Sequence, residues 1–528
     1  MVPSSVGYAH SELNKATPSP NSQYDSSPSE IRLIFSERLE NGLYRIIVLD
    51  TKGNAVTDAK TELSQDQREI SLALPSLPDG LYTTSYKVIS ADGHPIRGSY
   101  IFIVGQTEGQ FSDEQGNNIS NNVHDHANGG TGNNFWFYMA RFVYYVSLLV
   151  LIGLLFWLNV WKLDGTVLSN LRKTWIHSIL IALLVSFVIT MLYHIESIFQ
   201  QEDNFEDLIQ FFSGTTVGIT WLFTLGLTLI GFACLQRNKW IDLAWIVLIT
   251  TTEALNGHPM GFTPELQNVV LDFVHIITGA IWAGGLIYVY LQKRFIQDKW
   301  MLFLPVFSKV ALISILTLVV TGTAITLAFI PDIDYLIYSL WGILLLIKIT
   351  LVLVVVLVGI LLRNQMRKKQ QKHISTLLKI DTCLMLLILV IVGIFTMIKP
   401  LPSNNSLEWT ELSINQNVNV SIAPNTPGVE NQIKVKVWMP DSVKQDPKQV
   451  LMYLHFTDRS EDVAPIEVKF NLEENAVSEL IYPGFMPHSY ISNGSYLPFA
   501  GKWEVEVRVM DPDDNETVYR RSMRLFKQ

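Results

Sequence analysis

Hydrophobic and polar positions divide the chain into three segments with different patterns. Residues 1–134 are polar with short apolar runs, residues 135–400 are dominated by long apolar runs, and residues 403–528 are polar again. An apolar run of about 20 residues can cross the hydrocarbon of a bilayer as a helix. The middle segment predicts eight such helices, near residues 136–161, 174–195, 209–235, 240–256, 268–291, 304–329, 335–362 and 375–398.

Charges between these runs predict the orientation in the membrane. Lys and Arg gather after the first, third, fifth and seventh runs, whereas the intervening loops are acidic or neutral. Because positive loops stay in the cytoplasm, we expect a multi-pass protein of the plasma membrane with both termini extracellular. An exported N-terminal domain requires a signal sequence, and we interpret residues 1–9, which end in Ala9, as the remnant of a signal peptide.

Both polar segments carry strand patterns. Short β-branched and aromatic runs alternate with period two between turns, near residues 30–36, 44–50, 80–90 and 98–104, and near 417–423, 432–438, 450–456 and 501–509. Several short strands of this kind favour β-sandwiches. The expected fold class is therefore mixed: a β-sandwich over 10–105, a flexible Gly- and Asn-rich linker over 106–134, an eight-helix transmembrane domain over 135–400, and a second, extracellular β-sandwich over 403–528.

Composition narrows the functional classes. The chain has 528 residues, of which 48% are hydrophobic and 16% charged, as is typical of membrane proteins. Its net charge of −9 argues against nucleic-acid binding. The two cysteines, Cys234 and Cys383, lie in apolar runs, so neither polar segment holds a disulfide. No ATP-binding P-loop and no phosphorylated-aspartate motif is apparent in the sequence, so nothing in it indicates an ATP-driven pump.

Three residues of the N-terminal segment have the chemistry of a copper site. His10, as a mature N-terminus, would offer an α-amine and an imidazole. Asp92 and His94 are two positions apart and would share one side of an extended segment. A nitrogen-rich tetragonal set with one carboxylate suits Cu(II). An isolated Asp-Gly-His is also a common turn sequence, and this alternative stays open.

Two stretches of this segment resemble CopC copper-binding proteins. The stretch from Ala9-His10 to Ile31-Arg-Leu-Ile-Phe35 is similar to their beginning, and Asp92-Gly-His94-Pro-Ile-Arg-Gly98 is similar to their closing strands. The resemblance implies a copper-binding β-sandwich with His10, Asp92 and His94 as Cu(II) ligands. Some members also have a methionine-rich Cu(I) site, but residues 10–104 contain no methionine, so we expect none here.

The outer ends of the predicted membrane helices carry further metal-binding side chains. Ionisable groups inside a bilayer are costly and are therefore candidates for function. Imidazoles and thioethers accept copper, and thioethers favour Cu(I). We expect a membrane copper path built from His194, His258, Met260, His275 and Met191. The alternatives are an interfacial His194, a structural pair of His275 with Asp272, a core position for Met191, and haem ligation by paired histidines.

Other polar residues are weaker candidates. Glu253 and Asp272 lie near the same outer ends. Lys348 lies within an apolar run, where it would either pair with a carboxylate or repel cations. Arg141 is expected to extend its charged end to the membrane surface. In the C-terminal segment, Met486 and His488 lie in a predicted loop and are candidates for another copper site.

The membrane segment resembles CopD proteins. The resemblance rests on Gly257-His258-Pro and on the sequence from His275 to Trp282-Ala-Gly284-Gly285-Leu286. The C-terminal sandwich is similar to YtkA/FixH-like domains, and the order of segments is similar to that of YcnJ-type copper transport proteins. The resemblance implies a copper carrier, not an enzyme. Such a carrier would capture Cu(II) outside the cell and pass copper inward. Its partners would be copper ions, the lipid bilayer and extracellular or cytoplasmic copper chaperones. A haem-containing electron-transfer or sensory protein, and copper tolerance by sequestration, are the alternatives.

Overall fold

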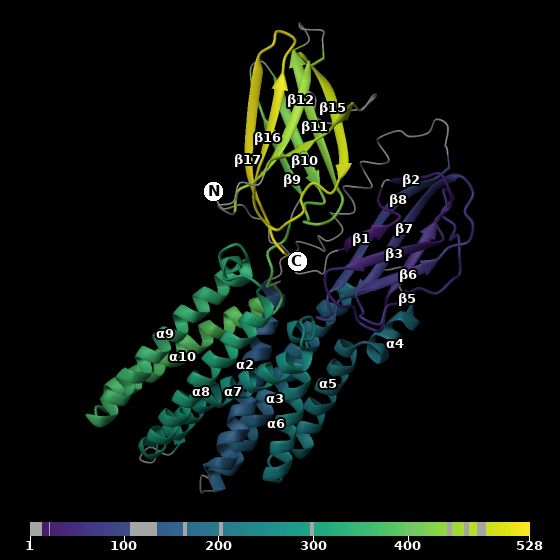
Figure 1. Cartoon of the computed structure of the whole chain (residues 1–528). Helices are drawn as coiled ribbons and strands as arrows, with labels where there is room; N and C mark the ends of the chain where they lie inside the picture. Colours follow the sequence, from purple (N-terminus) through teal and green to yellow (C-terminus); the bar gives the residue numbers. More distant parts are fainter. Residues whose placement is uncertain are drawn as a thin grey trace. The chain divides into compact units, whose positions relative to one another are not determined.

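The computed structural model describes residues 13–20, 22–105, 135–161, 166–199, 204–295, 300–398, 400–404, 406–413, 416–440, 446–458, 464–472 and 482–527, with the side chains of 166–172 and 258 left out. The chain divides into two compact units. The first comprises Met1–Thr107 and Asn122–Pro400, and the second comprises Glu108–Asn121 and Leu401–Gln528. Figure 1 labels their helices and strands.

The N-terminal domain consists of two four-stranded sheets, with strand orders β1-β3-β6-β5 and β2-β8-β7-β4. In β3 the side chains alternate, and Ile31, Leu33 and Phe35 are buried. They share one apolar core with residues of the second sheet such as Val88 and Phe102, as expected of a sandwich. The strands are β1 (Leu13–Thr17), β2 (Ser22–Tyr24), β3 (Glu30–Phe35), β4 (Arg45–Leu49), β5 (Glu62–Leu63), β6 (Glu69–Ala73), β7 (Gly80–Ile89) and β8 (Pro95–Val104).

The membrane domain is helical. In the part of the chain that the structure describes, seven helices are long and apolar enough to cross a membrane, which makes this a multi-pass membrane protein. They are α2 (Phe135–Val160), α3 (Thr166–Ile198), α5 (Thr216–Cys234), α7 (Glu265–Phe295), α8 (Trp300–Phe329), α9 (Leu340–Arg367) and α10 (Gln371–Phe395). The fourth predicted run forms α6 (Lys239–Ala254), which has 16 residues and is shorter than these spans.

One predicted helix boundary is wrong. The run predicted over 209–235 is interrupted, because residues Phe205–Gly214 form a separate helix, α4. Thr215 caps the helix that follows, since its side chain accepts a hydrogen bond from the backbone N–H of Gly218. A side chain at Gly218 would overlap the backbone of Phe211, so this glycine allows α4 to fold closely against α5. Hydropathy alone does not reveal such a break.

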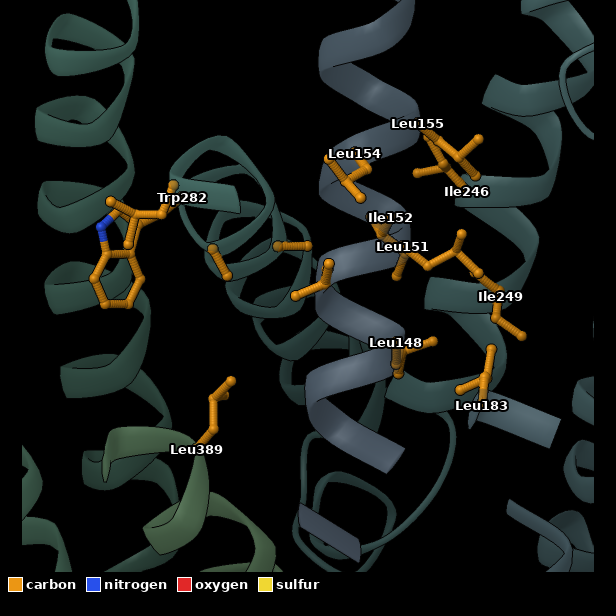
Figure 2. Packing of buried hydrophobic residues seen from close by; sticks show 14 of the residues in the cluster. Leu148, Leu151, Ile152, Leu154, Leu155, Leu183, Ile246, Ile249, Trp282 and Leu389 are labelled. Carbon is orange, nitrogen blue, oxygen red and sulfur yellow. The ribbon is translucent and has the colours of Figure 1, made fainter. Parts of the chain in front are cut away.

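Helix α2 is the centre of the helical packing. It contacts α3, α6, α7 and α10. Figure 2 shows Leu151 and Leu155 of α2 directed toward Ile249 and Ile246 of α6. Because lipid is as apolar as leucine, burial from water contributes little to helix association within a membrane, and close packing must supply the stability instead.

Glycines produce the closest helix contact, between α2 and α7. A Cβ at Gly153 would overlap the backbone of Ala280 and Gly284, and a Cβ at Gly284 would overlap the backbone of Gly153. A Cβ at Gly285 would meet the rings of Phe307 and Trp157. The Trp-Ala-Gly-Gly-Leu sequence is thus explained by helix packing.

The C-terminal unit also consists of two sheets, with orders β14-β15-β11-β10-β9 and β13-β12-β16-β17. The predicted loop around Met486 and His488 is wrong, because both residues lie in β15, paired with Met439 and Val437 of β11. The strands are β9 (Leu407–Glu411), β10 (Asn417–Ala423), β11 (Asn431–Pro440), β12 (Gln449–Phe456), β13 (Ile466–Val468), β14 (Asn471–Leu472), β15 (Phe485–Gly494), β16 (Gly501–Met510) and β17 (Glu516–Leu525).

The α2–α7 contact predicts the outcome of enlarging its glycines. Gly284→Leu should force the two helices apart and lower the free energy of unfolding by about 1–3 kcal/mol. The thermal unfolding temperature of the purified protein in detergent would measure this. Gly359→Leu in α9 is the matched control, because a Cβ there meets nothing within 4 Å. Equal unfolding temperatures for the two variants would contradict the packing role.

Candidate functional site

The turn between β7 and β8 brings Asp92 and His94 together. Gly93 has a φ of +92°, a conformation that glycine adopts without strain. The Gly93 N–H donates to the Ser90 carbonyl at 2.8 Å, and the Ser90 N–H donates to the His94 carbonyl at 2.9 Å. Asp92 Oδ2 then lies 4.0 Å from His94 Nε2, and both side chains are at least nine-tenths buried. The geometry fits two ligands of one metal ion.

This geometry corrects one detail of the sequence interpretation. Asp92 and His94 do lie on one side of the backbone, but a tight turn places them there rather than an extended segment. The Ser90 hydroxyl donates to Asp92 Oδ1 and accepts from the His94 N–H, so it holds both ends of the turn. His10, the third predicted ligand, lies outside the described residues.

The turn is buried because the N-terminal domain contacts the ends of the membrane helices. A Cβ at Gly93 would lie 2.8 Å from the Val217 side chain in the first turn of α5. Beside it, Glu40 Oε2 accepts a hydrogen bond from the Thr216 N–H at 3.0 Å. The carboxylate therefore meets the positive end of a helix dipole, where a negative charge is stabilised.

Two arginines extend the same contact. Arg97 donates to the carbonyl of Ile198, the last residue of α3, where a positive charge complements the helix dipole. Arg38 forms an ion pair with Glu265, the first residue of α7. Together with Glu40, these side chains attach the N-terminal domain to the ends of α3, α5 and α7.

Burial raises the pKa of Glu40, because a carboxylate loses its hydration there. The hydrogen bond from the Thr216 N–H opposes this shift, as do the nearby Thr216 hydroxyl, the Val217 N–H and the charge of Arg38. The side chain is still largely excluded from solvent, since Glu40 is 5% exposed. A carboxylate in this position needs polar partners on both oxygens.

His194 of α3 lies next to a partly buried arginine. Arg141 Nη1 is 3.4 Å from His194 Nε2, and the same guanidinium donates to Thr396 Oγ1 at 2.7 Å and to the Gly393 carbonyl at 3.2 Å. The partners of Arg141 thus lie on α3 and at the end of α10. His194 also interacts electrostatically with His94, the predicted Cu(II) ligand.

Glu253 and Asp272 are both engaged with other side chains. Tyr144 of α2 donates to Glu253 Oε2 at 2.6 Å. Lys348 interacts electrostatically with Asp272, so the pairing interpretation of Lys348 fits the structure better than a free repulsive charge. His275 Nδ1 lies 2.9 Å from Thr321 Oγ1 of α8, so the described partner of this ring nitrogen is a hydroxyl group.

The predicted membrane copper path is only partly described. Met191 packs against the apolar core of the helical domain. Met260 lies in a short 3₁₀ helix, His258–Met260, and lines a cavity beside Glu40. The side chain of His258 lies outside the described part. Among the described residues, no group of three or more His, Cys, Asp or Glu side chains converges as a metal site. The full ligand set therefore stays a prediction.

In the C-terminal unit, Met486 is exposed, and His488 Nδ1 lies 3.2 Å from Asp446 Oδ1. His455 Nε2 lies 3.7 Å from Glu506 Oε2. Glu506 is also bound by Arg508 and Arg520, which makes it the centre of a structural network rather than a free ligand.

Sequence reasoning missed the residues of the domain contact. Glu40, Arg38 and Arg97 lie in polar stretches whose sequence carries no sign of a helix-end partner. Their partners are distant along the chain, 176 residues away for Glu40 and 101 for Arg97. The missed role of Arg141 had a detectable signal, because a charge within an apolar run requires a partner.

Family models match three parts of the chain. The CopC domain model matches residues 13–105, the model of the copper resistance protein D-like N-terminal domain matches 133–261, and the copper resistance protein D model matches 301–395. The order of these matches is that of a CopC–CopD fusion.

Individual proteins are similar over different lengths. The copper transport protein CutJ of Bacillus subtilis is 25% identical over 97% of this chain and 95% of its own length. The protein YobA of Escherichia coli is 35% identical over 18% of this chain and 80% of its own length. The crystal structure of CopC from Methylosinus trichosporium is 33% identical and covers 19% of this chain and 100% of its own, with a TM-score of 0.18.

The Glu506 network predicts a pH-dependent stability. Burial alone would raise the pKa of Glu506, but hydrogen bonds from Arg508 and Arg520 outweigh it and lower the pKa. Its stabilisation is therefore present above the ordinary carboxyl pKa and is lost as the pH falls through the lower folded-state value. Glu506→Gln should cost about 2 kcal/mol at pH 7 and almost nothing well below pH 4.

Calorimetric unfolding of the full chain would measure this difference. Glu516→Gln is the control, because Glu516 is exposed and lies 3.7 Å from its arginine partner. A cost of Glu506→Gln that does not change with pH would contradict the ionic explanation.

Proposed function

Because the chain belongs to the CopC–CopD fusion proteins, we propose that it is a copper carrier of the plasma membrane that captures Cu(II) outside the cell and passes copper inward. The observation that carries this proposal is the attachment of the Asp92-Gly93-His94 turn to the ends of the membrane helices. His94 and His194 also interact electrostatically, which supports a path from the turn to α3.

The charge pattern supports the direction of capture. The N-terminal domain contacts the end of α3 and the beginnings of α5 and α7. These ends flank the acidic loops near residues 196–207 and 256–265, which the positive-inside rule assigns to the exterior. Eight crossings, with α6 as the short one, return the chain to the same side, so both termini would be extracellular.

Physical chemistry explains why such a carrier needs protein ligands. A bare metal cation in hydrocarbon faces a cost of tens of kcal/mol, and successive ligands remove most of it. Attachment of the donor domain at the mouth of the path raises the local concentration of copper there. A membrane potential negative inside would then favour inward movement by about 2.3 kcal/mol per charge per 100 mV.

The ligand roles follow from position. Asp92 and His94, with His10 as the third ligand, would hold Cu(II). His194, His258, Met260, His275 and Met191 would form the path. No reaction is assigned to these residues, since binding and release suffice for a carrier.

Removal of one turn ligand should weaken Cu(II) binding. His94→Ala should raise the Kd for Cu(II) at least about 100-fold and alter the nitrogen hyperfine pattern of its electron paramagnetic resonance spectrum. Asp92→Asn should weaken binding less, because the amide oxygen keeps one neutral donor. His373→Ala is the control, because His373 is an exposed histidine far along the chain. Unchanged Cu(II) affinity in His94→Ala would exclude this site.

Transport requires a separate test. Purified protein in proteoliposomes with an inside-negative potential should accumulate copper, and His94→Ala should slow this accumulation at low copper concentration.

Two measurements test the alternative functions. A Soret band in the absorption spectrum of the purified protein would favour the haem alternative. Cells that lack the gene should contain less copper; unchanged content with greater copper sensitivity would favour sequestration instead.

A further inference from the structure

A cavity of about 210 Å³ lies where the N-terminal domain contacts the membrane helices. The N-terminal domain contributes Arg38, Glu40, Gln67 and Ala91 to its wall, and the membrane domain contributes Thr216 and Met260. Ala91 directly precedes Asp92, so the cavity adjoins the turn that carries the proposed Cu(II) ligands. It lies between the capture site and the membrane helices.

One oxygen of Glu40 has no partner among the described residues. Oε2 accepts the Thr216 N–H at 3.0 Å, whereas Oε1 is buried and makes no hydrogen bond within the described part of the chain. Glu40 as a whole is 5% exposed. A buried acceptor that lacks a donor is unfavourable, and more so when it carries a charge, unless a ligand supplies the missing interaction.

The charges near this oxygen favour a cation. Arg38 also lines the cavity and interacts electrostatically with Glu40, while its guanidinium pairs with Glu265 and donates to Gln67. Two carboxylates thus surround one guanidinium, and Glu40 contributes the excess negative charge. A cation in the cavity would balance it, whereas an anion would meet repulsion.

The thioether of Met260 favours some cations over others. It is a soft ligand that magnesium and calcium do not favour but copper accepts. A carboxylate oxygen suits Cu(II) and a thioether suits Cu(I), so this pair of ligands can accept copper in either oxidation state. Met260 is also a member of the predicted membrane path, so the cavity shares one residue with that path.

We propose that this cavity is a transfer site for copper, in which Glu40 Oε1 and the Met260 thioether are ligands for an ion on its way from Asp92 and His94 to the membrane helices. The proposal rests on the carrier function. It adds to that function a second copper position, with Glu40 as a ligand as well as a contact residue.

Cu(I), prepared from copper sulfate with ascorbate, is the sharpest probe, because thioether ligands distinguish it best. The full chain in detergent would be titrated against a Cu(I) chelator, and its X-ray absorption spectrum would be recorded. Glu40→Gln and Met260→Leu should each weaken one Cu(I) site by about 10- to 100-fold. Met260→Leu should also remove one sulfur scatterer from the copper environment.

The variants are chosen to preserve the fold. The amide of Glu40→Gln can still accept the Thr216 N–H, and leucine has nearly the volume of methionine. Glu30→Gln and Met366→Leu are the matched controls, because both residues lie outside the cavity lining. Cu(II) resonance from the Asp92 and His94 site should be unchanged in all four variants, which checks that the N-terminal domain is intact.

Uptake by proteoliposomes separates failure of this site from failure of the carrier function. Slower uptake by Glu40→Gln and Met260→Leu, with normal Cu(II) capture, would support the transfer site. Cu(I) affinity and uptake within twofold of wild type in both variants would overturn it and leave the carrier function in place. Wild-type protein that accumulates no copper would overturn both.

Discussion

The hydrogen bond between Glu40 and the first turn of α5 is the interaction on which the arrangement of the candidate site depends. It joins a charged side chain of a β-domain to the positive end of a helix dipole. Arg97 makes the opposite contact at the end of α3. Because each charge meets the helix end of complementary sign, the orientation of the N-terminal domain is specified, and the Asp92-Gly93-His94 turn faces α5. Without this attachment the turn would have no fixed position relative to the membrane helices.

The charges inside the membrane domain limit how copper can move through it. Arg141 occupies the Nε2 side of His194. A unit positive charge 4 Å from another costs about 4 kcal/mol at an effective dielectric constant of 20, and copper would compete for the same lone pair. Copper binding at His194 thus requires that the guanidinium lie elsewhere. Tyr144 donates to Glu253, and the Glu253 carboxylate interacts electrostatically with Arg141.

Features of the structure that are determined by residues close together in the sequence could be predicted, whereas features that depend on distant residues could not. The membrane helices follow from apolar runs, and the pairing of Asp92 with His94 follows from three consecutive residues. The break before Thr215 and the strand around His488 could not be predicted, because the first depends on packing of α4 against α5 and the second on pairing with β11. Glu40 could not be predicted as a site residue either, since its partner lies 176 residues away.

Glu40 has two roles, attachment of the N-terminal domain and the proposed binding of copper, and these roles favour different hydrogen bonding of its carboxylate. For attachment alone, a carboxylate with both oxygens bonded, or a neutral acceptor such as glutamine, would be more stable, because an unpaired buried oxygen is costly. Arg38 is close enough to interact with Glu40, yet it pairs with Glu265 instead. Buried groups without hydrogen bonds are expected at functional sites, because a group that binds a ligand lowers the stability of the protein when the ligand is absent. In the proposed transfer site, Glu40 holds a helix end with one oxygen, and its other oxygen would be satisfied when a cation occupies the cavity that Met260 also lines.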